Sequence, residues 1–188
     1  MKSLAVAIAL LLPITAFAGP VTLSPANPQP NAVDMLPGLG VIYAYPKGVR
    51  HLADAKKALK KGRKGQPLKG LSYEDTKLGD LTLTSSSVYK VAAQISGFVQ
   101  FRAPGNYTVN VISNDGIVMS IGGKQVALYD EIHGCEPAGE QEVVVPKAGW
   151  YAVEATYFQK KGTSCLLMDW DVGGSMAPVP DSVFGHLR

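Results

Sequence analysis

Hydrophobic and polar residues alternate in short runs over most of the chain after residue 73. In the run 107–113, Tyr107, Val109 and Val111 fall on one face of an extended segment, which is the pattern of a half-buried strand. Gly, Pro, Asn and Asp separate the runs, which predict strands over 88–94, 98–102, 107–113, 117–121, 124–128, 142–145, 150–158 and 164–172. So many short strands predict an all-β fold, an antiparallel β-sandwich or barrel.

A helical periodicity occurs once, over 51–61. Leu52, Ala55 and Leu59 recur at near-helical spacing, which predicts one short surface helix near the N-terminus. We expect the segment 62–67 to end this helix and to form a mobile basic loop. The basic residues here are Lys56, Lys57, Lys60, Lys61, Arg63, Lys64 and Lys69, with no acidic residue between them. A solvated loop explains them, and binding to a polyanion such as an anionic cell-surface glycan is the functional alternative.

The first residues have the pattern of an export signal. Lys2 precedes an apolar run over 4–14, which ends in Ala16-Phe17-Ala18, and we therefore predict a signal peptide over 1–18. The Pro-rich segment 19–37 is expected to be an extended lead-in outside the core, and 38–188 to be a single domain. No other segment is long and apolar enough to span a bilayer. These features predict a periplasmic or secreted protein.

Composition agrees with one globular domain. The chain has 188 residues, of which 46% are hydrophobic and 18% charged, which excludes a disordered chain. The formal net charge of +3 is too small to indicate nucleic-acid binding by the protein as a whole.

The chain has two cysteines, Cys135 and Cys165. An oxidising compartment favours a disulfide between them. A pair of buried free thiols and a metal site that uses His133 with Cys135 are the alternatives, but the cysteines lack the spacing of common metal motifs.

The turn 113–116 is the most informative short segment. Asn114 and Asp115 place an amide oxygen and a carboxylate side by side between two predicted strands, and we expect these oxygens to point outward. Calcium takes six to eight oxygen ligands, and such a pair could supply part of that shell. Sugar hydroxyls could bind the same oxygens. The structural alternative is a plain turn, because Asn, Asp and Gly all favour turns.

An ordered series of short segments resembles one known family. The segments are FVQF (98–101), PGNYTV (104–109), SNDGIVMSIGGK (113–124), AGWY (148–151), YF (157–158), LLMDW (166–170) and VP (179–180). Together they resemble the protective-antigen fourteen-kilodalton domain over nearly the whole mature chain. The resemblance implies a β-sandwich or barrel of an exported protein that often binds carbohydrate.

The resemblance also implies where the ligands bind. In adhesins of the family, two adjacent aspartates at the position of Asn114-Asp115 are joined by a cis peptide bond and hold calcium, which contacts sugar hydroxyls. Gln159 lies where a second ligand loop is expected, and Tyr129 is a candidate for an exposed binding rim. Asn114 replaces the first aspartate, so the pair has one negative charge fewer and is expected to hold calcium more weakly.

The chain offers little that indicates catalysis. His51, His133 and His186 are not accompanied by a nucleophile signature such as GxSxG, so we predict no catalytic residues. The sequence therefore predicts a non-enzymatic, lectin-like recognition module that binds a glycan or cell-surface polysaccharide at Asn114, Asp115, Gln159 and Tyr129, with calcium as a cofactor held by the first three. A structural or protein-interaction component of the bacterial cell envelope, with an envelope protein as partner, is the alternative.

Overall fold

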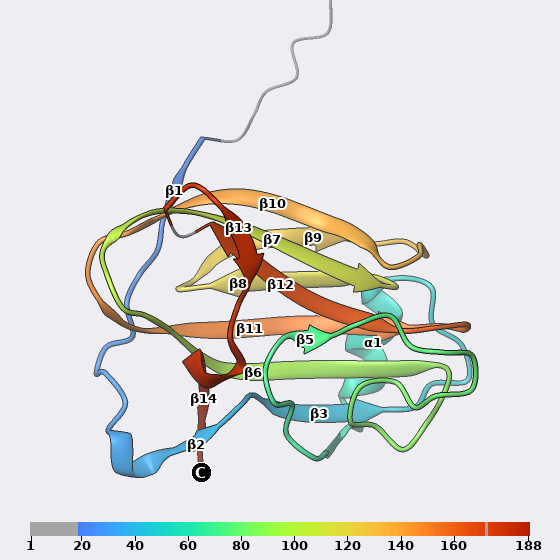
Figure 1. Ribbon diagram of the computed structural model, residues 1–188. Helices are drawn as coiled ribbons and strands as arrows, with labels where there is room; N and C mark the ends of the chain where they lie inside the picture. Colours follow the sequence, from blue (N-terminus) through green and yellow to red (C-terminus); the bar gives the residue numbers. More distant parts are fainter. Residues whose placement is uncertain (1–18, 172) are drawn as a thin grey trace, which may run out of the picture.

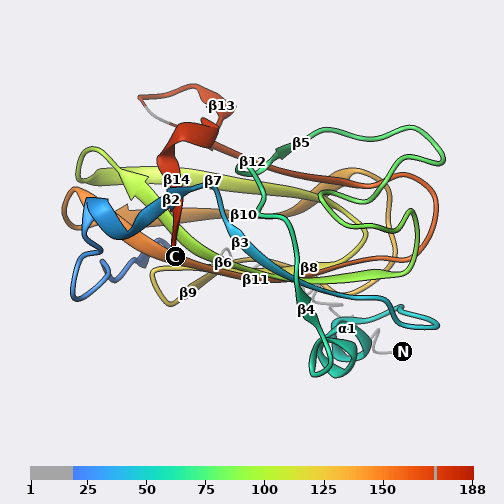
Figure 2. The ribbon, with the colours of Figure 1, turned by 90° about the horizontal axis from the view of Figure 1, so that it is seen from below.

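The structure is a computed structural model that describes residues 19–171 and 173–188. The predicted signal peptide lies outside the described residues. In these described residues, two β-sheets stack face to face, and a single α-helix lies against the outside of one of them (Figures 1 and 2). The predicted β-sandwich is therefore confirmed, with two separate sheets and not a closed barrel.

The first sheet, sheet A, has the strand order β1-β10-β7-β12-β13, and β5 also pairs with β12. Its strands are β1 (Val21–Thr22), β5 (Ser72–Tyr73), β7 (Gly105–Asn114), β10 (Glu136–Val145), β12 (Cys165–Asp171) and β13 (Met176–Pro178). All of its pairs are antiparallel except β1 with β10.

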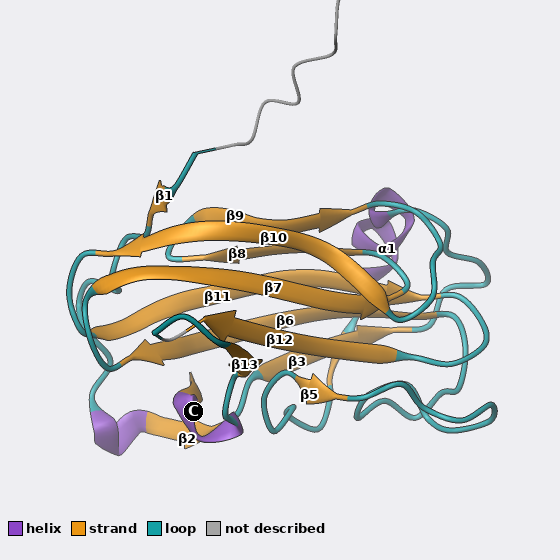
Figure 3. Ribbon diagram, turned by 45° about the horizontal axis from the view of Figure 1, so that its top comes forward, coloured by secondary structure: helices purple, strands orange, loops and turns teal. Residues whose placement is uncertain are grey.

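The second sheet, sheet B, has the order β2-β14-β6-β11-β8-β9, with β3 beside β6 and β4 beside β3. Its strands are β2 (Met35–Pro37), β3 (Gly40–Ala44), β4 (Arg63–Lys64), β6 (Val91–Phe101), β8 (Ile117–Ile121), β9 (Lys124–Tyr129), β11 (Gly149–Gln159) and β14 (Phe184–Leu187). Short 3-10 turns at Ala32–Asp34 and Asp181–Val183 precede β2 and β14. Figure 3 shows the strands of the two layers running side by side.

The core fills the space between the sheets. On β7, Tyr107, Val109 and Val111 are buried, as their alternation predicts, because successive side chains of a strand point to opposite faces. Tyr151, Val153 and other inward residues of sheet B pack in the same core. The alternation of apolar and polar side chains along the strands thus determines which face of each sheet packs in the core.

The helix α1 (Leu52–Leu59) covers one end of the outer face of sheet B. Its Leu52 and Ala55 are buried in a second, smaller cluster with Ala92 and Phe158. Asp130 anchors its first turn by accepting a hydrogen bond from the backbone N–H of Leu52. The helix predicted over 51–61 is thus confirmed. Within the described residues, no helix is long and apolar enough to cross a membrane.

Two predictions of strand boundaries are wrong. The strand predicted over 142–145 begins earlier, at Glu136, as β10 (Glu136–Val145). The segments 88–94 and 98–102 were expected to be separate strands, but residues 91–101 form the single strand β6, whose Ser96 and Gly97 pair with Glu154 and Val153 of β11. Gly97 is required by packing and not by a turn, since a Cβ there would lie 2.6 Å from the carbonyl oxygen of Gly185 in β14.

The segment 19–37 was expected to lie outside the core, and this too is wrong. It supplies β1 and β2, and Leu23 is 1% exposed within the main cluster. The backbone N–H of Ser24 donates to the carbonyl of Gly122 at 3.0 Å, and a Cβ on Gly122 would lie 2.7 Å from the oxygen of Ser24. Gly122, with a φ of 53°, therefore lets the N-terminal segment pack against the β8–β9 turn.

The segment 62–67, expected to be a mobile loop, contains a short paired strand instead. Arg63 and Lys64 form β4 and pair with Tyr43 and Ile42 of β3. Gly65 continues the pairing through its N–H, which donates to the oxygen of Val41 at 2.9 Å. Strand pairing thus holds Arg63 and Lys64 in place, although the composition of the segment 62–67 is typical of a loop.

Candidate functional site

The candidate residues lie at the end of the sandwich where β7 and β11 finish, on the right in Figure 1. The peptide bond between Asn114 and Asp115 is cis, as the resemblance implied. The backbone N–H of Asp115 donates to the oxygen of Phe158 at 3.1 Å, and Asp115 Oδ2 accepts a hydrogen bond from the N–H of Lys160 at 2.6 Å. Gln159, between those two partners, is thus held beside Asp115.

Thr163 connects the other two candidate ligands. Its hydroxyl accepts a hydrogen bond from Asn114 Nδ2 at 3.1 Å, and its backbone oxygen accepts one from Gln159 Nε2, also at 3.1 Å. The hydroxyl of Tyr157 donates to the backbone oxygen of Asn114. The structure therefore brings Asn114, Asp115 and Gln159 together in one corner.

The expectation that these oxygens point outward is wrong. Asn114 is 6% exposed, Asp115 1% and Gln159 0%. The loops after β9 and β11 cover the corner. His133, in the first loop, and Lys160, in the second, both form hydrogen bonds to Asp115. The candidate site is a buried polar corner beneath two loops and not an open turn.

Tyr129 lies at the margin of this corner. It is partly buried against the main core, and its ring stacks on that of His133 with a centroid separation of 3.8 Å and an interplanar angle of 16°. His133 Nε2–H in turn donates to the backbone oxygen of Asp115 at 2.9 Å. Tyr129 is thus connected to the corner through His133 and forms part of its surface.

Sequence reasoning missed three members of this network: Ser113, His133 and Thr163. The oxygen of Asp115 accepts a second hydrogen bond from the Ser113 hydroxyl at 2.6 Å. The sequence suggested His133 only as a metal ligand beside Cys135, not as a partner of Asp115. The available signal for His133 was its position two residues before Cys135, because a disulfide from Cys135 to β12 places this loop close to β7.

Burial determines the electrostatics of the corner. Desolvation raises the pKa of Asp115 above its ordinary value of 3.8, and the Lys160 N–H and the nearby His133 oppose this shift. Desolvation also raises the pKa of Tyr157, which therefore remains a hydrogen-bond donor. A carboxyl group whose ionised form is penalised by burial gains from a nearby cation.

One buried atom in the corner has no partner. Gln159 Oε1 is buried and accepts no hydrogen bond within the described residues, although such an orphaned acceptor is costly. Carboxylate and amide oxygens are the donors that calcium prefers. The residues of this corner therefore fit a hard cation in donor chemistry, with one negative charge from Asp115.

The disulfide between Cys135 and Cys165 is confirmed, with an S–S distance of 2.01 Å. A metal site that uses Cys135 with His133 is thereby excluded, because the sulfur is bonded. Asp75 lies close to both sulfurs, but the same bond removes them as ligands. Cys165 is the cross-strand partner of Asn114, so the disulfide joins the covering loop directly to the corner.

Comparisons with known proteins identify the fold. No protein-family model matches the chain, and curated proteins yield no match either. Among solved structures, the PA14 domain of the antifreeze protein MpAFP is similar with a TM-score of 0.66, at 14% identity, over 84% of this chain and 93% of that one.

Two adhesin structures are similar as well. The PA14 sugar-binding domain from an RTX adhesin has a TM-score of 0.60 at 18% identity and covers 80% of this chain and 99% of that one. The A domain of epithelial adhesin 9 from Candida glabrata, in complex with Galβ1-3GlcNAc, has a TM-score of 0.66 at 13% identity over 90% and 97%. The chain thus has the fold of PA14 domains, so the resemblance to the protective-antigen domain is confirmed for the fold.

Proposed function

We propose that this chain is a non-enzymatic, exported recognition module that binds carbohydrate at the corner formed by Asn114, Asp115 and Gln159. The observation that carries the proposal is the unpartnered Gln159 Oε1, buried beside a desolvated carboxylate. A cation gives both groups a partner. Similarity in fold to a sugar-binding domain and to an adhesin in complex with a disaccharide supports the choice of ligand.

Calcium is the cofactor that suits these donors. Asp115 and Gln159 would hold it, together with the amide oxygen of Asn114. When bound, calcium supplies positive charge and open coordination positions for sugar hydroxyls. The chain itself contributes the rest: Thr163 orients both amides, and the carbonyl of Asp115 is fixed by Ser113 and His133.

The half-buried ring of Tyr129 supplies apolar surface at the same end of the sandwich. Sugar rings pack their C–H faces on aromatic side chains, and the stacked His133 holds this ring in place. The disulfide supports the proposal that the module acts outside the cytoplasm, because such bonds persist in oxidising compartments.

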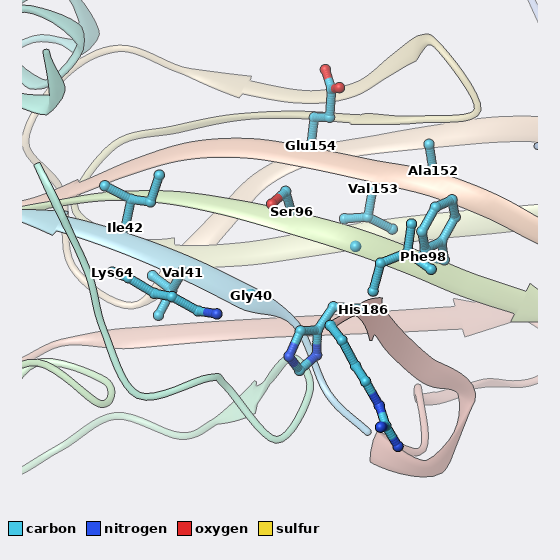
Figure 4. A pocket seen from close by; sticks show the side chains of 13 residues that line it. Gly40, Val41, Ile42, Lys64, Ser96, Phe98, Ala152, Val153, Glu154 and His186 are labelled. Carbon is cyan, nitrogen blue, oxygen red and sulfur yellow. The ribbon is translucent and has the colours of Figure 1, made fainter. Parts of the chain in front are cut away.

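Binding to an envelope protein is the second candidate. A hollow of about 460 Å³ lies on the outer face of sheet B, between β3, β6, β11 and β14 (Figure 4). Ile42, Phe98 and Ala152 give it an apolar lining, with Glu154 at one side and Lys64 and His186 at the other. A lining of this kind suits a protein partner better than a small neutral sugar.

A glycan array separates the two candidates. The protein is applied with calcium and with chelator, beside the Asp115→Asn variant, which keeps an acceptor for the Lys160 N–H and removes the charge. Glu142→Gln, which neutralises an exposed carboxylate on β10, is the matched control. We expect calcium-dependent binding by the wild type and the control but not by Asp115→Asn. Equal signals with calcium and chelator would contradict the proposal, and the absence of any binder would favour the protein partner.

A further inference from the structure

A group of basic residues around α1 and β4 forms a second feature of the molecule, distinct from the Asp115 corner. The basic residues on α1, on β4, between these two elements and in the segment after β4 are exposed to solvent: Lys56, Lys57, Lys60, Lys61, Arg63, Lys64 and Lys69. No acidic residue occurs between positions 55 and 73. Within the described residues, none of these side chains forms an ion pair. We name this group the basic strip.

The basic strip lies on a fixed scaffold. α1 is held by Leu52 and Ala55 against sheet B, and β4 is paired with β3. Gly62 lies between the two elements, and its backbone packs closely on β3, since a Cβ there would lie 2.5 Å from the side chain of Ile42. Because the backbone beneath these side chains is already fixed, only the side chains lose freedom on binding, which favours affinity for an anionic ligand.

A cavity opens directly beside the strip. It has a volume of about 440 Å³ and is lined by Tyr43, Ala44, Tyr45, Pro46, Ala58, Lys61 and Arg63. Tyr45 is 50% exposed, and its hydroxyl is held by the backbone N–H of Ser86 at 3.2 Å and the Ser86 hydroxyl at 3.0 Å. The ring of Tyr43 stacks behind it at a centroid separation of 6.5 Å. The cavity thus combines one oriented aromatic ring with two cations.

We propose that this cavity and the basic strip bind an anionic polysaccharide, whose sugar rings carry carboxylate or sulfate groups. A sugar ring lies against Tyr45, while Lys61 and Arg63 pair with its anionic groups. The planar guanidinium of Arg63 suits a bidentate contact with either anion. The remaining lysines of the strip attract the neighbouring charges of the chain.

The surroundings favour this ligand over other polyanions. The apolar residues of α1 pack on sheet B, so the helix has no apolar face to insert into a membrane surface. Single-stranded nucleic acid is bound by several interleaved aromatic rings, whereas Tyr45 is the one exposed ring among the residues that line the cavity.

Binding of polygalacturonate and of heparin, measured by isothermal titration calorimetry at low salt, tests the proposal. Carboxylated and sulfated rings are thereby distinguished. We expect binding that weakens with salt, a loss of about fivefold for Lys61→Gln or Arg63→Gln and of roughly tenfold for Tyr45→Ala. Tyr45→Phe, which keeps the ring, retains most of the affinity. Lys124→Gln and Lys147→Gln, exposed at turns of the opposite end, are the matched controls with unchanged affinity.

Several outcomes would overturn the proposal. The absence of binding to both polysaccharides is one. Equal affinity for duplex DNA or anionic vesicles, with no effect of Tyr45→Ala, is another, because it would reveal only general attraction to polyanions. Chelator and Asp115→Asn are expected to leave this binding unchanged, so its failure is distinguishable from failure of the calcium-assisted site.

Discussion

Removal of the disulfide tests how the corner is held. The bond links Cys135, in the loop that carries His133, to Cys165, which lies opposite Asn114 in the β7–β12 pair. Breaking it releases the covering loop from sheet A. We therefore predict a loss of global stability together with a loosening of the corner.

The magnitude follows from the size of the closed loop. The cysteines are separated by 30 residues, and closing a loop of that length removes unfolded-state entropy worth about 3 to 4 kcal/mol. For a domain of this size, each kcal/mol lowers the melting temperature by about 2 to 4 °C. The reduced protein is thus expected to melt roughly 6 to 16 °C below the oxidised one.

Thermal denaturation with and without reductant measures this difference, and the Cys135→Ser, Cys165→Ala double variant repeats it without reductant. The double variant and the reduced wild type should melt at similar temperatures. Reductant should leave the double variant unchanged, which controls for effects of the reagent. A wild type that melts at the same temperature in both states would mean that the disulfide does not stabilise the fold.

Two further predictions concern the corner and the N-terminal segment. Burial raises the pKa of Asp115 in the folded protein above 3.8, so the folded state favours the protonated carboxyl. Without calcium, stability should therefore fall as the pH rises from 3.8 through the folded pKa; pH-dependent denaturation of Asp115→Asn should lack this fall, and an equal fall in both would contradict the assignment. Leu23→Ala should cost about 2 to 5 kcal/mol in chemical denaturation, because Leu23 is 1% exposed. A loss near zero would mean that segment 19–37 is not part of the core.

Alternation along the chain predicted the sandwich because each long strand buries one face. β8 begins and ends where the pattern 117–121 predicts, since Gly122 and Gly123 follow it directly. The short strands β2, β4 and β13 escaped prediction, because two or three residues have no readable period. Their pairing partners, such as β3 for β4, are determined by tertiary contacts.

The proximity of Asn114, Asp115 and Gln159 was predictable from the sequence, but their burial was not. Asn114 and Asp115 occur in a turn, and turns are usually exposed. Here the disulfide brings the loop containing His133 over the turn, while Lys160 and Thr163, in the loop after β11, close it from the other side. These contacts join parts of the chain that are far apart in sequence. No local pattern encodes them.

Calcium binding to the folded protein decides whether the Asp115 corner is a cation site. Isothermal titration calorimetry of calcium into chelator-treated protein should reveal a single site with a Kd of about 10⁻⁴ to 10⁻³ M, because only Asp115 supplies charge. The Glu142→Gln control should bind equally, and Asp115→Asn should give no binding heat. A wild type without binding, or an Asp115→Asn variant that binds as well as the wild type, would contradict the claim that this corner holds the cation.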